Sequence, residues 1–248
     1  MQRHLRSCLA EAIGTFFLTF IAAGAICTDL ATGGKLGVLG IAVAYGLAMS
    51  IAVSATMNIS GGHINPAVTL TMWVYKKIDT DKTIYYIIAQ FVGAIIAAGI
   101  LVAFFGTTAD ATEGGFGTPH VTKLLQQSTS QAQIVAIGIE AVLTLLLVFA
   151  VFGTVVDPKA PKIGGFGVGM TVCAAFLVGG PFTGAALNPA RAFGPAIWEA
   201  GIRGDFSLLK EFLVYLIGPV VGGILAGGLY LNYILPPDEP PGTITHGK

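Results

Sequence analysis

Six long apolar stretches constrain this chain more than any other feature. They cover residues 8–29, 36–57, 83–105, 132–156, 163–181 and 211–235. A helix needs about 20 largely apolar residues to cross the hydrocarbon core of a bilayer. Charged residues make up only 10% of the chain and the mean hydropathy is +0.79, whereas soluble domains carry about a quarter charged residues. The sequence therefore predicts an all-α membrane protein with six transmembrane helices in the lipid bilayer.

Two shorter segments, at about 65–75 and 188–199, each begin with Asn-Pro-Ala. Asn is a favourable helix N-cap, and Pro suits the first helical position because its missing N–H would have had no partner there. At 1.5 Å per residue, such a segment reaches only about halfway across the hydrocarbon. We therefore predict two re-entrant half-helices that start inside the membrane. The residues of the two motifs are Asn65, Pro66, Ala67, Asn188, Pro189 and Ala190.

The two halves of the chain repeat each other beyond this tripeptide. AEAIGTFFLTF at 10–20 resembles IEAVLTLLLVF at 139–149, and AQFVGAIIAAG at 89–99 resembles GPVVGGILAGG at 218–228, with the same offset. A unit with three full spans inverts its successor, as in transporters built from inverted repeats. We predict one channel domain, residues 1–235, with inverted repeats at about 5–106 and 132–235. The proline-rich end, 236–248, is expected to be a disordered tail.

The segments before each half-helix, ISGGHI and FTGAAL, have no regular pattern. Irregular backbone at membrane depth is tolerated only where it is buried in protein or lines a water-filled cavity. Two such segments at one depth predict a polar conduit that is lined by backbone carbonyls. The carbonyls expected there belong to Gly61, Gly62, His63, Ile64, Gly184, Ala186 and Leu187.

Glu11 and Glu140 are acids within the predicted spans, at matching positions of the two repeats. An intramembrane carboxylate can belong to a proton relay. Alternatively, each can accept hydrogen bonds from the irregular loop of its own half. One acid per repeat favours the second interpretation, so we predict loop support.

Other features bear on location, partners and cofactors. Lys and Arg are more frequent on the side that holds both chain ends, which predicts cytoplasmic termini in the cell membrane. The net charge is zero, so nothing indicates a nucleic-acid partner. His63 has no second ligand at metal-binding spacing, and His4 and His120 are expected to be solvated loop residues. We predict no metal site and no cofactor.

The motifs SGGHINPAVTL and GPFTGAALNPARAFGPA make the chain resemble the aquaporin, or major intrinsic protein, family over about residues 5–235. The resemblance implies six tilted helices and two half-helices that surround one pore per subunit of a homotetramer. It further implies a passive channel that conducts water in single file and excludes protons and ions. Half-helix dipoles have this excluding role in aquaporin-type pores.

The resemblance also places the narrow outer constriction, called the selectivity filter, at Tyr45, Phe176, Ala185 and Arg191. Strict water channels of the family typically have Phe and His at the first two of these positions, and glycerol channels have Trp and a small residue. This chain matches neither set. Two large rings favour a narrow opening for water, whereas the loss of a polar His removes a hydrogen-bond partner.

Other function classes are alternatives to a water channel. A broader facilitator of glycerol, urea or ammonia is the nearest alternative. A secondary transporter also uses inverted repeats and broken helices, but it needs an in-span acid for ion coupling. An enzyme is disfavoured because the spans carry no nucleophile–base pair and no HExxH motif.

Overall fold

The structure is a computed structural model that describes residues 4–106 and 115–235, and every regular element in these ranges is helical. Six segments are long and apolar enough to cross a membrane. They are α1 (Leu5–Ala31), α2 (Gly37–Ser60), α4 (Thr80–Phe105), α7 (Ala132–Val151) continued by η3 (Phe152–Val156), α8 (Phe166–Thr183), and α10 (Phe212–Leu229), which η4 (Phe206–Lys210) precedes and η5 (Tyr230–Ile234) follows. The six predicted spans and the all-α fold class are confirmed. The predicted tail, 236–248, lies outside the described residues.

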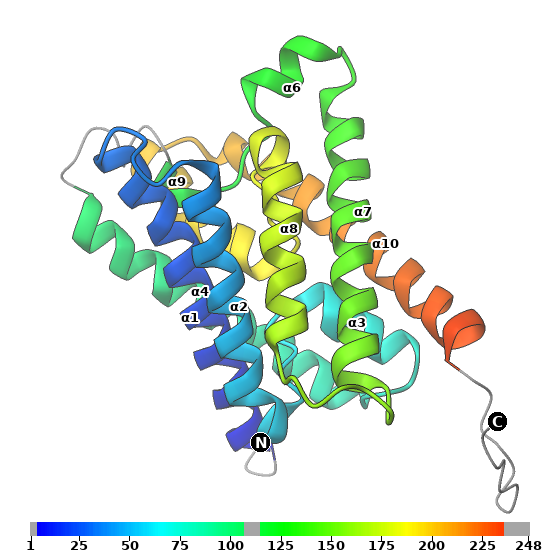
Figure 1. Ribbon diagram of the computed structural model, residues 1–248. Helices are drawn as coiled ribbons and strands as arrows, with labels where there is room; N and C mark the ends of the chain where they lie inside the picture. Colours follow the sequence, from blue (N-terminus) through cyan, green and yellow to red (C-terminus); the bar gives the residue numbers. More distant parts are fainter. Residues whose placement is uncertain (1–3, 107–114, 236–248) are drawn as a thin grey trace, which may run out of the picture.

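Two shorter helices begin at the Asn-Pro-Ala motifs. They are α3 (Pro66–Val74) and α9 (Pro189–Arg203). The second helix continues past its predicted end at residue 199. It stops at Gly204, whose left-handed φ of 66° terminates it. In Figure 1, α9 lies toward the top of the molecule and α3 toward the bottom. The short elements η2 (Gly115–Gly117) and α6 (Lys123–Ser128) belong to the connection between the two halves of the chain.

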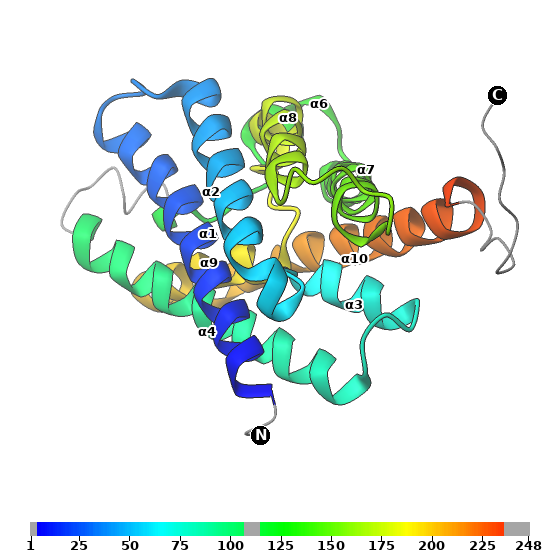
Figure 2. The ribbon, with the colours of Figure 1, turned by 60° about the horizontal axis from the view of Figure 1, so that its bottom comes forward.

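Helix packing follows the same plan in both halves of the chain. Helix α1 packs against α2 and α4, and α7 packs against α8 and α10. Each half-helix lies against the last span of both halves, and the turned view in Figure 2 shows α3 beside α10. The start of α1 and the end of α10 point toward the same, lower end of the molecule in Figure 1, as an even number of crossings requires.

Small residues let the helices of the two halves approach closely. Helix α2 packs against α8, and a Cβ atom on Gly46 would lie 2.6 Å from Cys173 Cβ and 2.8 Å from the Gly169 carbonyl oxygen. Such contacts between small residues are typical of helix interfaces within membranes.

Large apolar side chains cover the outside of the bundle. Ile13 is 63% exposed, Ile96 is 53% exposed and Val178 is 67% exposed. Large apolar side chains exposed to this extent on several helices are unusual for a soluble monomer. It is the surface expected of helices that face lipid.

Candidate pore

Each half-helix begins at an asparagine whose side-chain oxygen accepts hydrogen bonds from backbone N–H groups of that helix. Asn65 Oδ1 accepts from the Ala67 N–H at 2.8 Å, and Asn188 Oδ1 accepts from the Ala190 and Arg191 N–H groups at 3.0 and 3.2 Å. These bonds fill the N-cap position, where the first N–H groups of a helix lack intrahelical partners. They also fix the orientation of both side-chain amides.

The two asparagines also connect the halves of the chain. Asn65 Nδ2 donates to the Leu187 carbonyl at 2.8 Å, and Asn188 Nδ2 donates to the Ile64 carbonyl at 2.9 Å. Both asparagines are buried. A side-chain amide has two N–H donors, so each asparagine retains one donor beyond this reciprocal exchange.

The loops before the half-helices adopt backbone conformations that most residues avoid. Ile64, Ala185 and Leu187 have φ values of 42°, 39° and 53°. Non-glycine residues in this region cost roughly 1–3 kcal/mol each, and such conformations persist where their surroundings hold them. These loops therefore need a strong external support.

Glu11 provides that support in the first half. Its carboxylate accepts hydrogen bonds from the backbone N–H groups of His63 at 3.0 Å and Ile64 at 2.5 Å. Gln90 Nε2 also donates to Glu11 Oε2 at 2.8 Å. Hydrogen bonds to a charged acceptor are about twice as strong as neutral ones.

Glu140 has the corresponding place in the second half. It accepts from the backbone N–H groups of Ala186 at 3.0 Å and Leu187 at 2.8 Å, and from Thr183 Oγ1 at 2.7 Å. Both glutamates are completely buried. Each carboxylate thus binds the loop of its own half.

Three of the four residues assigned to the constriction lie together. The Arg191 guanidinium carbon lies 5.6 Å from the centre of the Tyr45 ring, within cation–π range, and the Tyr45 and Phe176 rings lie 6.0 Å apart. Arg191 is fully buried, and its Nη1 donates to the Gly117 carbonyl at 3.0 Å. Its Nε and Nη2 have no hydrogen-bond partner among the described residues. Two donor nitrogens are therefore left for a molecule at this point, while Ala185 is buried in the adjoining loop.

Several of the carbonyls expected to face the conduit already accept a protein hydrogen bond. The Ala186 carbonyl accepts from the Tyr45 hydroxyl at 2.6 Å, and those of Ile64 and Leu187 accept from the two asparagines. A carbonyl oxygen has two lone pairs, so each can accept a second hydrogen bond. Tyr45 therefore acts on the second loop as well as on Arg191.

The sequence did not predict the contacts that the connection between the two halves makes with Arg191 and with the acidic side chains near it. Gly117, the partner of Arg191, lies in a glycine-rich loop with no motif that predicts the contact. His120 lies in a loop and its side chain is 34% exposed, but its two ring nitrogens, instead of facing only solvent, contact the Glu199 and Glu211 carboxylates. The available sequence signal was Glu199, an acid in the segment that follows the second Asn-Pro-Ala motif, since a charge that becomes buried needs a partner.

His63 contacts neighbouring side chains of its own half. Its Nδ1 lies 3.2 Å from Thr69 Oγ1, and its ring packs edge-on against Tyr86. Within ranges 4–106 and 115–235, no group of three or more His, Cys, Asp or Glu side chains could hold a metal ion.

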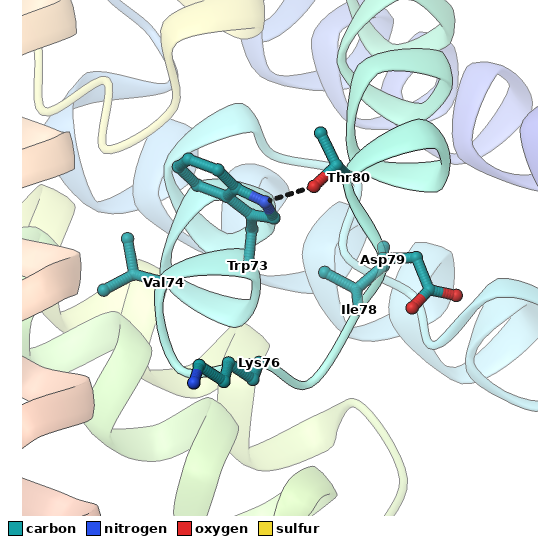
Figure 3. Close-up of a pocket in the computed structure, with 6 residues that line it drawn as sticks. All are labelled: Trp73, Val74, Lys76, Ile78, Asp79 and Thr80. Atoms are coloured by element: carbon teal, nitrogen blue, oxygen red, sulfur yellow. Dashed lines mark hydrogen bonds between the residues drawn. The ribbon is translucent and has the colours of Figure 1, made fainter.

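A surface pocket of about 570 Å³ lies at the turn that follows α3 and contains none of the residues above. Figure 3 shows Trp73 at this pocket, where its Nε1 donates to Thr80 Oγ1 at 3.0 Å. The contact ties the end of α3 to the start of α4. The pocket is therefore a feature of this turn and is separate from the candidate pore.

Comparison with known proteins extends the resemblance over almost the whole chain. The model of the major intrinsic protein family matches residues 1–230. The chain is 41% identical to aquaporin AqpM of Methanothermobacter thermautotrophicus, over 91% of this chain and 96% of that protein. It is 38% identical to the probable aquaporin TIP3-2 of Arabidopsis thaliana, over 98% of this chain and 89% of that protein.

A solved structure shares the fold. The X-ray structure of the aquaglyceroporin from Plasmodium falciparum has a TM-score of 0.78 and 23% identity, and the match covers 93% of this chain and 97% of that one. With the family match and the two relatives, these findings establish that the chain belongs to the major intrinsic protein family.

Proposed function

We propose that this protein is a passive membrane channel that conducts water in single file and excludes protons and ions. The observation that carries the proposal is the pair of buried asparagines at the starts of two half-helices, each with one amide donor left after the reciprocal exchange. A water that accepts from both amides turns its own hydrogens away from them. Its neighbours then cannot pass a proton across it through a continuous hydrogen-bonded file.

The half-helices supply the field that repels cations. The N-terminal end of a helix carries a partial positive charge of about half a unit. Helices α3 and α9 begin at asparagines that bond to each other's loops, so both positive ends lie near one point. Arg191 lies in the first turn of α9, directly after the Asn-Pro-Ala motif. It adds a full positive charge and hydrogen-bond donors for a passing molecule. In such a pore, Glu11 and Glu140 hold the carbonyl-lined loops and do not carry protons.

Tyr45, Phe176, Ala185 and Arg191 form the narrow filter in this proposal. The two adjacent rings support a small opening, which favours water over larger neutral solutes. The names of the two relatives, both aquaporins, also support water. A wider role for glycerol, urea or ammonia is the alternative, and the Plasmodium structure, described as an aquaglyceroporin, shows that the same fold also occurs in that branch.

The proposal includes the arrangement of the chain in the membrane. Residues 1–235 would form one channel domain of two inverted repeats, supported by the matched positions of Glu11 and Glu140. The Lys and Arg distribution supports cytoplasmic termini. Membership of the family supports a homotetramer with a pore in each subunit.

Stopped-flow light scattering on proteoliposomes tests this function, with water and glycerol measured for the natural chain and for Phe176→Gly. We expect fast water and negligible glycerol flux for the natural chain. In Phe176→Gly, glycerol permeability should rise about tenfold, because size discrimination of this order follows from the removal of a few side-chain atoms. Val178→Ala is the matched control, since Val178 lies on the same helix and is 67% exposed.

Rapid glycerol flux in the natural chain would instead assign the protein to the broader facilitators. Water permeability no higher than that of protein-free liposomes would overturn the proposed channel altogether.

A further inference from the structure

A charged cluster lies where the connection between the halves meets α9 and the start of α10. His120 Nδ1 lies 2.7 Å from Glu211 Oε2, and His120 Nε2 lies 3.0 Å from Glu199 Oε2. Glu199 comes from α9 and Glu211 directly precedes α10. Arg203 of α9 pairs with the other oxygen of Glu199 at 3.2 Å. His120 thus bridges α9 and the start of α10, which η4 connects along the chain.

The segment that carries His120 also carries the partner of Arg191. Gly117, three positions before His120, accepts from Arg191 Nη1 at 3.0 Å. A Cβ atom on Gly117 would lie 2.6 Å from the Ala23 carbonyl oxygen, so the segment is pressed against α1. On the far side of His120, the Val121 N–H donates to Glu211 Oε1 at 2.9 Å. The attachments to Glu199 and Glu211 therefore lie close to the contact that orients the guanidinium.

The contacts of His120 favour a protonated imidazole. A neutral ring has one donor nitrogen and one acceptor nitrogen, whereas both are donors in the charged form. Here both nitrogens face carboxylate oxygens, so a neutral ring would oppose one lone pair to another. Partial burial alone would lower the pKa of His120, but hydrogen bonds and charge from Glu199 and Glu211 outweigh it and raise the pKa to about 9.

Other titratable groups around the ring are accounted for. From α9, Glu199 and Arg203 face the cluster, and from the start of α10, Glu211 and Tyr215 share its small pocket. The two carboxylates are the groups that bond to the ring itself. Because the folded-state pKa is raised above the ordinary value, the bridge is complete at neutral pH and is lost as pH rises through about 9.

We propose that His120 is a positioning residue for the filter: by bridging Glu199 and Glu211 it holds the 115–121 segment so that the Gly117 carbonyl fixes Arg191. This inference rests on the proposed channel function. When the bridge opens, the guanidinium loses its one protein hydrogen-bond partner among the described residues and becomes less ordered. The filter then discriminates less well between water and a larger neutral solute.

The test measures water and glycerol permeability of the full chain in proteoliposomes from about pH 6 to about pH 10. The natural chain should keep a constant water-to-glycerol ratio near neutral pH and lose selectivity reversibly with a midpoint near the pKa of about 9. His120→Ala should lower the ratio about threefold at neutral pH and abolish the pH transition. Glu211→Gln should move the transition toward neutral pH, because one of the two charges that raise the pKa is removed.

His4→Asn is the matched control, since it removes a histidine at the start of α1, far from this cluster in the chain. Its pH profile should match that of the natural chain. An unchanged ratio and profile in His120→Ala would overturn the proposal while leaving the water channel intact. A proportional fall of both permeabilities would also overturn it, because it indicates a purely structural role. If His120→Ala does not fold, the shift in Glu211→Gln decides the question, and a profile identical to the natural one refutes the bridge. Absence of water flux in the natural chain would refute the channel itself.

Discussion

Single carboxylates hold together the least regular backbone of this molecule. Glu140 accepts two hydrogen bonds from a loop in which Ala185 and Leu187 have positive φ, and a third from Thr183 at the end of α8. Glutamine at this position keeps an oxygen but replaces the other with an NH₂ group, which would face backbone donors. A buried donor left without a partner costs about 1–3 kcal/mol.

Glu140→Gln should therefore destabilise the folded protein by about 2 kcal/mol and lower its thermal unfolding midpoint in detergent. The measurement is the temperature of unfolding of the purified chain, followed by circular dichroism. Asp81→Asn is a suitable control, since Asp81 is exposed at the start of α4. Equal midpoints for Glu140→Gln and the control would show that the second loop does not depend on this carboxylate.

Residue-level prediction from sequence succeeded where a signal is local and stopped where it is not. The Asn-Pro-Ala motif marks a helix start because the cap bonds to N–H groups within three residues. The bonds from Asn65 to Leu187 and from Tyr45 to Ala186 join positions more than 120 residues apart, at separations of 122 and 141. No local pattern specifies such contacts, so they required the structure.

At the scale of elements, each half-helix combines capping with donation in one side chain. Aspartate at position 65 separates the two roles, because it keeps the oxygen that caps Ala67 but lacks the amide donor for the Leu187 carbonyl. It also puts a negative charge at the positive end of α3, where helix dipoles favour anions.

We expect Asn65→Asp to retain the folded bundle, conduct less water and admit more sodium ion than the natural chain. Sodium flux into proteoliposomes and stopped-flow water permeability, measured on the same preparation, check both effects. Asn58→Asp, on the exposed part of α2, controls for the added charge. Sodium exclusion as complete as in the natural chain would argue against the field of the half-helices as the barrier to cations.

Close packing between spans depends on glycines at matching places in the two halves. A Cβ atom on Gly222 of α10 would collide with the Ala141 carbonyl oxygen of α7, and one on Gly93 of α4 would collide with the Ala12 carbonyl oxygen of α1. In both cases the obstacle is backbone, which cannot rotate away as a side chain can.

Gly222→Ala should therefore destabilise the chain by about 1–3 kcal/mol, the usual range for overpacking. Gly138→Ala on α7 is its matched control, because nothing lies within 4 Å of the added atom. Thermal unfolding in detergent compares the two variants. Similar stability of both would mean that α7 and α10 can separate to admit a methyl group at little cost.

For the whole molecule, the lengths of the apolar stretches and the repeated Asn-Pro-Ala motif predicted six spans and two half-helices. Apolar length is a property of each segment alone, so the six spans follow directly from the sequence. The second half-helix is longer than predicted, since it continues past Glu199 to Arg203, and in the fold Glu199 is buried and paired with His120 and Arg203. A charge paired across the fold is compatible with a continued helix, and the pairing cannot be seen in one segment.

The whole molecule also decides between a channel and a secondary transporter. A transporter exposes its site alternately and couples it to an ion, commonly through a titrating carboxylate in the membrane. Here Glu11 and Glu140 each hold two backbone N–H groups of their own loop, so protonation of either would weaken the loop it supports. A site with this construction favours a fixed conduit over an alternating one.

Water flux through the proteoliposomes should therefore rise in proportion to the osmotic gradient and be equal in both directions. Imposed sodium or proton gradients should not change it. Its temperature dependence should be weaker than that of protein-free lipid, since a fixed file of donors and acceptors needs no conformational change for each molecule. Stopped-flow traces at several temperatures, with and without ion gradients, measure all of these properties. Saturation of the flux together with a requirement for an ion gradient would instead establish coupled transport, and Glu11 and Glu140 would then be the residues to examine as the coupling site.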